Sequence, residues 1–379
     1  MLGRAPVDRR QRYGRGLEGR VVGDTAISEI DGTAGALLYR GYPVGDLVEH
    51  SSFEEVASLV LHGELPSRAE LADWQAELAA WADPPAAALA ALCRVPAGAH
   101  PLALYRTMLT VAACHMPEPE DTRLDAQWRR PARILAWTAA LAAAAIRHLG
   151  GRGPLPARPE LGYAGNFLWQ ARGREPSALE VRAFDASLIV QAEHGLHAAC
   201  FAALVVISTG ADLGSAVLAG MGALSGVRHG GANQLAFENL ERLATPQEAR
   251  DWARQGIARG ARFPGFGHRV YRCPDPRVTA LAPYARRILA SHGLEDRWEV
   301  YRTLCDEVEG ALGPKGVYAN VDSITGLVYH PLGLPATALP IPFCLAIQTG
   351  WMAHCLEYLP GGEVISPGAV YAGPAGQAS

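Results

Sequence analysis

The sequence predicts a mainly α-helical protein with a short β element near its N-terminus. Helix-start signals recur along the chain, and no strand-like runs alternate with helical ones in the way that a parallel sheet requires. The strand signal lies in residues 19–32, GRVVGDTAISEIDG, where β-branched residues stand between turn formers and predict a small β-hairpin. At 379 residues, the chain is long enough for a large core and two domains.

The first two helices are predicted from capping boxes. Ser52 and Glu55 have the spacing at which side chain and backbone cap each other, and Gly63 ends the apolar run that follows. Ser67 and Glu70 repeat this spacing before a second helix, which we expect to run through residues 69–82.

Two later helices are predicted from N-cap residues followed by proline. Proline suits the first helical position because its missing N–H would have no partner there. We expect one helix from Thr245-Pro246 to Gly260, and another from Asp275-Pro276 to Gly293.

Three apolar runs are interpreted as buried helices. Residues 134–146 are too few to span a membrane, and residues 204–208 lie within a longer apolar stretch. Residues 323–356 contain no Asp, Glu, Lys or Arg, but several prolines interrupt their first half. The second half is expected to form a buried helix at a core or subunit interface. Residues 116–131 and 150–162 are polar and Pro-rich and predict long loops.

Charge and cysteine content narrow the class of protein. A net charge of −4 argues against nucleic acid or an anionic membrane as the main partner. The seven cysteines are scattered and contain no CxxC, which favours reduced thiols and a cytoplasmic protein. The N-terminal residues have no apolar stretch of the kind found in a secretory signal.

The stretch GFGHRVYRCPDPR, residues 265–277, indicates a functional site. Two glycines around Phe266 free the backbone for conformations that a helix does not use, so we expect His268 on a loop. Asp275 then caps the following helix, and Arg277 lies at its positive end.

Three other polar residues stand in settings that suit acid–base chemistry. His229 precedes paired glycines, and His194 is expected inside an apolar helix, where an unpaired polar ring costs stability. Asp322 borders the long uncharged run, where burial would raise its pKa. Each alone is more often a satisfied core residue or a cap, but with His268 they form a plausible acid–base group.

Two other motifs do not indicate the dinucleotide site or the metal site that they resemble. The GxGxxG at residues 14–19 lacks the preceding strand that a dinucleotide site needs. His194 and His197 would share a helix face, but no third ligand completes a metal site.

Several motifs resemble the citrate synthase family, in particular its shorter bacterial and archaeal type, and they occur in the family's order. They are GLEGRVVGDTAISEIDGTAGALLYRGYPVGDL, SSFEEVASLVLHGELPSRAEL, SGVRHGGANQ, GFGHRVYRCPDPR and KGVYANVD. The resemblance implies an all-helical homodimer whose two domains close over the substrates. We expect a flexible tail at 1–18, a large domain at 19–221 and 328–379, and a small domain at 222–327 that carries the catalytic loops.

By this resemblance, the chain condenses an acyl-CoA, acetyl- or propionyl-CoA, with a 2-oxo acid through an enol, without metal or bound cofactor. Asp322 would remove the α-proton, His229 would donate a hydrogen bond to the enol, and His268 would polarise the ketone. His194 and Arg277 would bind the oxo acid.

Coenzyme A is expected to be bound beside the catalytic loops. The loop backbone and the nearby cations are the candidates: Gly265, Phe266, Gly267, Arg269, Arg272 and Lys315.

The chain departs from the family where substrate carboxylates are bound. Ile347, Ser366 and Gly368 stand at places where the family usually has arginines. Other changes lie close in sequence to the candidate residues His194 and Asp322. Gln191 and His197 replace His and Asn, and Ser323 and Ile324 replace an aromatic pair. The chain also ends soon after Tyr371.

These departures predict an acceptor other than plain oxaloacetate, with fewer carboxylates or a larger apolar part. A carboxylate in a partly desolvated site needs a cation in place of its lost water, and Ile347 offers an apolar wall instead. One alternative is synthesis of citrate or 2-methylcitrate, with Arg40 or Arg228 supplying the missing positive charge. A second alternative is a non-catalytic protein that only binds a ligand. The apolar helices also predict a homodimer with an apolar interface.

Overall fold

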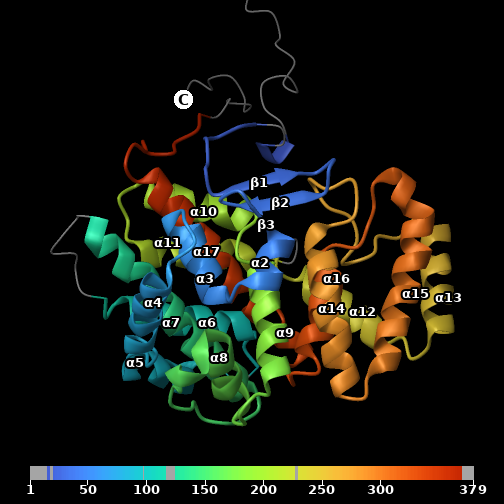
Figure 1. Ribbon diagram of the computed structural model, residues 1–379, viewed down its shortest axis with the longest axis horizontal. Coiled ribbons are helices and arrows are strands. Elements are labelled where there is room, and N and C mark those ends of the chain that lie inside the picture. The colour runs from blue at the N-terminus through green and yellow to red at the C-terminus, as the bar shows by residue number, and fades with distance from the viewer. Residues whose placement is uncertain (1–14, 18–19, 97, 117–123, 227–228, 369–379) are drawn as a thin grey trace, which may run out of the picture.

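The computed structural model describes residues 15–17, 20–96, 98–116, 124–226 and 229–368. The fold is helical, with one small sheet at the edge of the molecule (Figure 1). The predicted N-terminal tail lies mostly outside the described residues, and so do Arg228 and Tyr371.

The β element is a three-stranded antiparallel sheet with strand order β1-β2-β3. It comprises β1 (Ser28–Asp31), β2 (Ala36–Tyr39) and β3 (Tyr42–Pro43), with Ile30 opposite Leu37. The prediction of a hairpin is confirmed, although residues 20–27 form no strand and the pairing continues beyond residue 32.

After the sheet, the described chain consists mainly of α-helices. Their bounds are α2 Val44–His50, α3 Phe53–His62, α4 Arg68–Ala80, α5 Ala86–Ala90, α6 Pro101–Ala113, α7 Leu124–Leu149, α8 Gly162–Arg172, α9 Ala178–Ile189, α10 Ala198–Ile207, α11 Leu213–Leu224, α12 Ala232–Glu241, α13 Pro246–Ala258, α14 Pro276–Ser291, α15 Glu295–Leu312, α16 Val321–Tyr329 and α17 Pro340–Tyr358. Short 3-10 turns stand at η1 Arg15–Leu17, η2 Ala91–Arg94, η3 Pro159–Leu161, η4 Gly313–Lys315 and η5 Ala336–Ala338.

The capping predictions are confirmed. Complete capping boxes at Ser52 and Ser67 start α3 and α4, and Gly63 ends α3 in a left-handed conformation. Thr245 and Asp275 cap α13 and α14 through their side chains. Because a cap depends on residues at most three positions apart, the sequence alone is sufficient to place it.

Two helix assignments were wrong. Of the predicted loop at 116–131, residues 117–123 lie outside the described residues, and residues 124–131 belong to α7, with Pro131 inside that helix. There, burial of the largely apolar stretch 134–146 outweighs the hydrogen bond that proline removes. His194 and His197 do not share a helix, because Gly195 adopts a positive φ of 62° and residues 190–197 connect α9 to α10.

The uncharged run forms the core of the chain itself. The stretch Ala336–Tyr358 is long and apolar enough to cross a membrane, yet 89% of its most apolar window is buried inside the protein. Helix α17 packs against α3, α7, α10 and α11. The run and the Ala-rich part of α7 are therefore covered within one chain and give no support for a dimer, which stays a prediction from the family resemblance.

Helices α12 to α16 lie together on one side of the molecule, with α9 and α2 between them and the remaining helices (Figure 1). Contacts of α14 with α9 and α2, and of α16 with α9, join the two groups. The domain boundaries at residues 221/222 and 327/328 stay a prediction. The loops before α14 and α16 carry the candidate site.

Candidate active site

Two loops pair to form the centre of the site. Gly267 N–H donates to the Tyr318 carbonyl over 2.7 Å, and Asn320 N–H donates to the Gly265 carbonyl over 2.9 Å. The Asn320 side-chain amide also donates to the Gly267 carbonyl over 2.7 Å. This bridge joins the GFGH loop to the start of α16, so His268 and Asp322 come from adjoining segments although 54 positions separate them in the sequence.

Gly265 is required for this close approach. Its φ is 82°, and a Cβ there would lie 2.9 Å from the Ser323 Cα and 3.0 Å from the Ala236 Cβ. Gly267 has a similar φ of 81°, but the nearest atom to its Cβ position is 3.8 Å away, on Val317. The sequence predicted a loop here, and the structure shows that only the first glycine is also confined by its neighbours.

The loop determines which nitrogen of His268 carries the proton. Its Nδ1 lies 3.0 Å from the Val270 N–H and 3.2 Å from the Tyr271 N–H, and both groups can only donate. Burial, reinforced by Arg277, lowers the pKa of His268 to about 4. The ring is therefore neutral near pH 7, with Nδ1 as acceptor and the proton on Nε2.

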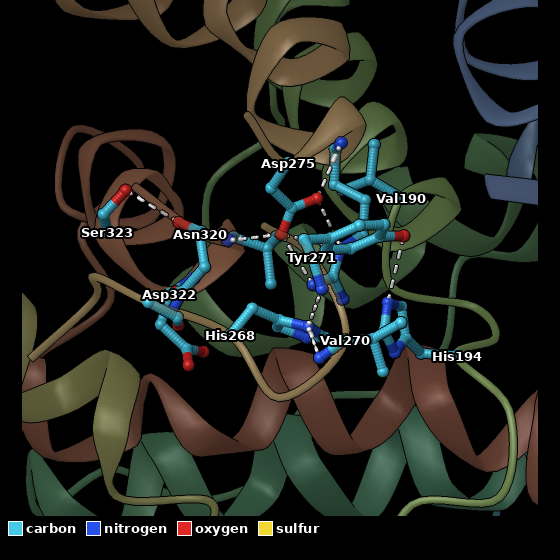
Figure 2. A network of polar contacts seen from close by, with 12 residues as sticks. Val190, His194, His268, Val270, Tyr271, Asp275, Asn320, Asp322 and Ser323 are labelled. Atoms are coloured by element: carbon cyan, nitrogen blue, oxygen red, sulfur yellow. Dashed lines mark hydrogen bonds and ion pairs between the residues drawn. The ribbon is translucent and has the colours of Figure 1, made fainter. Parts of the chain in front are cut away.

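His194 lies beside His268 and Tyr271 (Figure 2). Its ring centroid is 5.0 Å from that of His268, and its Nε2 is 3.3 Å from the Tyr271 hydroxyl. Burial and the neighbouring Arg277 lower the pKa of His194 well below its usual value. His194 is thus a neutral ring next to the ring that would polarise a ketone.

Arg277 is held by Asp275 at the start of α14. Its Nη2 donates to Asp275 Oδ2 over 2.7 Å and its Nε to Oδ1 over 2.9 Å. Asp275 Oδ2 also accepts the Val321 N–H over 3.3 Å, which ties the start of α14 to that of α16. Because Asp275 raises the already high pKa of Arg277, the guanidinium is a permanent charge.

Asp322 lies in the first turn of α16. Asn320 caps this helix by accepting the Asp322 N–H over 3.0 Å. Burial raises the pKa of Asp322 to about 6, although Arg277 opposes the rise. The predicted direction is confirmed, and the result is a carboxylate that is mostly ionised at neutral pH and more basic than an exposed one.

His229 belongs to a separate group of hydrogen-bonded rings with His197 and Trp351. Nε2 of His229 is 3.2 Å from Nδ1 of His197, and Nε2 of His197 is 3.2 Å from the indole nitrogen of Trp351. Among the described residues, His229 makes no direct hydrogen bond to His268 or Asp322. From the sequence, His197 was only a departure from the family and Trp351 was not singled out. The HxxH spacing and the Gly-Trp in the late helix were the available signals.

Most of the other departures have ordinary partners outside the catalytic group. Gln191 donates to the Tyr329 hydroxyl over 2.8 Å, and Ser323 Oγ lies 3.0 Å from the Tyr301 hydroxyl. Ile347 is 1% exposed in the middle of α17, and Ser366 and Gly368 are exposed near the C-terminus. The described structure therefore places no positive charge at the three arginine positions.

The predicted coenzyme A ligands are partly engaged in the loop itself. The N–H groups of Phe266 and Gly267 already donate to the carbonyls of Phe263 and Tyr318. Gly265, also predicted, is buried, and its carbonyl accepts the Asn320 N–H. The remaining predicted groups are cations with exposed side chains. Of these, Arg272 donates to the His268 carbonyl over 2.9 Å, and Arg269 and Lys315 are exposed.

The described residues contain no cluster of three or more His, Cys, Asp or Glu side chains that could hold a metal ion. What the arrangement offers is a carboxylate with a raised pKa, neutral imidazole donors and one fixed guanidinium. This set suits proton removal next to a carbonyl group.

Comparison with known proteins gives a consistent result. The family model described as citrate synthase, C-terminal domain, matches residues 16–368. A 2-methylcitrate synthase of Mycobacterium tuberculosis is 37% identical over 367 residues, which cover 97% of this chain and 92% of that protein. A citrate synthase of Deinococcus radiodurans is 32% identical over 359 residues, 95% of each chain.

Solved structures agree with the sequence comparison. Citrate synthase from Pyrobaculum aerophilum superposes with a TM-score of 0.90 at 30% identity, covering 96% of this chain and 93% of that one. A ternary complex of citrate synthase from Thermoplasma acidophilum with carboxymethyl coenzyme A and oxaloacetate gives a TM-score of 0.89 at 30% identity, covering 96% and 97%. The fold, the order of the motifs and these matches together show that the chain belongs to the citrate synthase family.

Proposed function

We propose that this protein is an acyltransferase that condenses an acyl-CoA with a 2-oxo acid through an enol. The observation that carries the proposal is the pairing of the GFGH loop with the start of α16, which brings His268 and Asp322 together in one site (Figure 2). Burial also raises the pKa of Asp322 to about 6 and keeps the His268 ring neutral. A proton α to a thioester is weakly acidic, so its removal needs both a positioned base and a hydrogen-bond donor at the carbonyl oxygen.

Each step has a residue suited to it. Asp322 takes the α-proton, and an N–H of His229 hydrogen-bonds to the enol oxygen that forms. The enol carbon attacks the ketone carbon of the oxo acid, and the N–H at His268 Nε2 hydrogen-bonds to the new alkoxide. The proton that the alkoxide takes up balances the one that Asp322 removed from the α-carbon. Water then cleaves the thioester and releases coenzyme A as the thiol. Neutral rings suit the two donor roles because each donates a hydrogen bond without carrying a charge into the buried site.

We propose further that the acceptor is not plain oxaloacetate. Arg277 is the fixed cation of the site, and Asp275 binds its Nε and Nη2. We propose that its Nη1 binds a single substrate carboxylate. Arg40, the described alternative, is committed elsewhere. Its Nε and Nη2 donate to the Val60 carbonyl over 3.3 and 3.0 Å, and its Nη1 is 4.0 Å from Glu357.

Losing the charge partner of a buried carboxylate typically costs about 2–5 kcal/mol, which is a factor of about 30 to several thousand in affinity. A second carboxylate would therefore weaken binding in this site. A 2-oxo acid with one carboxylate fits the available charge.

Synthesis of citrate or 2-methylcitrate is the second candidate. It is favoured by the names of the relatives, since the protein 37% identical to this chain is a 2-methylcitrate synthase. The two candidates differ in whether the acceptor carries a second carboxylate, so they can be separated directly.

The test is a panel of acceptors offered with acetyl- and propionyl-CoA, followed by release of free thiol. Oxaloacetate is compared with 2-oxo acids that carry one carboxylate and a methyl, ethyl or larger apolar group. We expect kcat/KM to be at least about tenfold higher for a monocarboxylic acceptor, with Asp322→Asn as the background control. Efficient turnover of oxaloacetate at micromolar concentration would contradict the proposed specificity and favour the second candidate.

Recognition of coenzyme A is proposed to depend on side-chain cations, because the N–H groups of Phe266 and Gly267 are already bonded. Calorimetry with coenzyme A and dephospho-coenzyme A tests whether Arg269, Arg272 or Lys315 reads the ribose phosphate. Equal affinity for both ligands would remove that role. Binding without any turnover would instead favour a non-catalytic, ligand-binding protein.

A further inference from the structure

We propose that His197, oriented by Trp351, is a positioning residue that fixes the tautomer of His229, so that Nδ1 of His229 presents its proton to the acyl thioester. This inference rests on the proposed function for its last step only. Its structural part, the tautomer itself, can be measured without any reaction.

The chain of hydrogen bonds begins at Trp351, which is 0% exposed in the middle of α17. An indole nitrogen can only donate, so the nitrogen that faces it, Nε2 of His197, must be an acceptor. The indole is held firmly from the other side. A Cβ added at Gly220 of α11 would lie 2.6 Å from Trp351 Cε3, which shows how closely that backbone approaches the ring.

His197 must therefore carry its own proton on Nδ1. A doubly protonated ring would point an N–H at the Trp351 N–H, and burial independently lowers the pKa of His197 to about 3. With its proton on Nδ1, His197 donates to Nε2 of His229 over 3.2 Å.

The same reasoning then applies to His229. Because Nε2 of His229 accepts a hydrogen bond, its neutral ring carries the proton on Nδ1, which is the nitrogen left for a ligand. Protonation of His229 at Nε2 would place its N–H against the N–H at Nδ1 of His197, so the arrangement also keeps His229 neutral. The direction of every bond in the series is set by the one group that cannot accept, the indole of Trp351, which lies 122 positions after His229.

Replacement of His197 by asparagine or aspartate should affect the tautomer of His229 differently. An asparagine at position 197 has a carbonyl oxygen that could accept from Trp351 and an amide that could donate to His229. It would preserve the direction of both bonds. An aspartate at the same place has nearly the same shape as asparagine but can only accept, and it would require His229 to donate from Nε2.

The primary test is ¹⁵N NMR of the histidine side chains in the full-length protein, in which the chemical shifts of the two ring nitrogens report the tautomer. The signals of His197 and His229 are assigned through the variants. In the unmodified protein we expect both rings to be neutral, with the proton on Nδ1. His197→Asn should leave the tautomer of His229 unchanged, and His197→Asp should move its proton to Nε2. An Nε2–H tautomer at His229 in the unmodified protein would overturn the proposal, and so would an unchanged tautomer in His197→Asp.

Exchange of the α-protons of acetyl-CoA in deuterated water supplies the functional test. We expect His197→Asn to keep kcat for exchange within a few-fold, and His197→Asp to lower it by about 10²-fold with a smaller change in KM. Equal losses in both variants would indicate a merely structural role for His197 and contradict the inference.

Trp351→Phe gives a second route if His197→Asp does not fold. It retains an aromatic ring but removes the N–H, so His229 should show a mixture of tautomers. A single Nδ1–H tautomer in that variant would contradict the role of Trp351. If the unmodified protein shows the expected tautomer but exchanges no proton of any acyl-CoA, the proposed function fails and the tautomer assignment stands.

Discussion

Asp275 holds the guanidinium of Arg277 through both of its carboxylate oxygens, within 2.7 Å at Nη2 and 2.9 Å at Nε. The pair is almost fully enclosed, with Asp275 2% and Arg277 4% exposed. Because Asp275 also accepts the Val321 N–H, the same carboxylate orients the guanidinium that we propose binds the oxo acid and the helix that carries Asp322.

Asp275→Asn should be strongly destabilising. The variant leaves the buried charge of Arg277 without its counter-charge, and breaking such a pair typically costs about 3–5 kcal/mol. The measurement is the free energy of unfolding from urea titration. Glu160→Gln is the matched control, because the pair of Glu160 with Arg158 lies at the solvent-exposed surface, where water screens the charges and the pair contributes little to stability. Similar losses of unfolding free energy in the two variants would show that the buried Asp275–Arg277 pair contributes no more to stability than an exposed pair.

Gly265→Ala and Gly267→Ala should differ although both glycines have nearly the same φ. Each alanine is strained by the left-handed backbone, at a cost of about 1–2 kcal/mol. Only at position 265 does the new Cβ also meet backbone, 2.9 Å from the Ser323 Cα, so the paired loops would have to separate. Thermal unfolding should show a clearly larger loss of stability for Gly265→Ala. Equal losses would mean that close contact between the loops does not constrain this position.

The rate of α-proton exchange should fall as the pH is lowered through about 6. Asp322 acts as a base only when ionised, and its pKa is raised to about 6, whereas the pKa of His268, lowered to about 4, leaves that ring neutral over the same range. The expected decrease approaches tenfold per pH unit below pH 6. Asp185→Asn is the control, since Asp185 has a pKa raised to about 7 by burial but lies on α9, where it accepts the Phe53 N–H. Its removal should leave the pH profile in place, and a profile that vanished with it would assign the titration to Asp185.

Asp322→Asn should keep or increase stability at pH 8. A carboxyl whose pKa is higher in the folded than in the unfolded protein binds its proton more tightly when folded. Ionised Asp322 therefore costs stability above about pH 6, by about 1–3 kcal/mol at pH 8, and this cost is absent below the unfolded pKa of about 4. Urea unfolding at pH 8 and pH 4 measures the difference. A variant less stable than the parent at pH 8 would show that the carboxylate has a structural role.

Local features of the fold could be predicted from the sequence. The caps at Ser52, Ser67 and Asp275 depend on neighbouring residues, and the GFGH loop follows from its glycines. Pro131 inside α7 could not be predicted, because distant packing decides whether a helix tolerates a proline.

The composition of the site was predictable to the extent that motifs repeat those of a family. Pairwise relationships were not. The HxxH and Gly-Trp motifs mark His197 and Trp351 in the sequence. The bonds from Trp351 to His197 and from His197 to His229 link three separate segments, so the motifs do not indicate which residues bond to each other. The dimer prediction from apolar helices lost its support for a related reason, because α17 is covered by helices of the same chain.

Incorporation of deuterium at the α-carbon of acetyl-CoA and propionyl-CoA is the most direct measurement of the proposed chemistry. The unmodified protein should exchange the α-protons, with or without an oxo acid present, and Asp322→Asn should exchange them at least about 10²-fold more slowly while remaining folded. No exchange with either acyl-CoA under any of these conditions, or equal exchange in the two proteins, would contradict the assignment of Asp322 as the base that forms the enol.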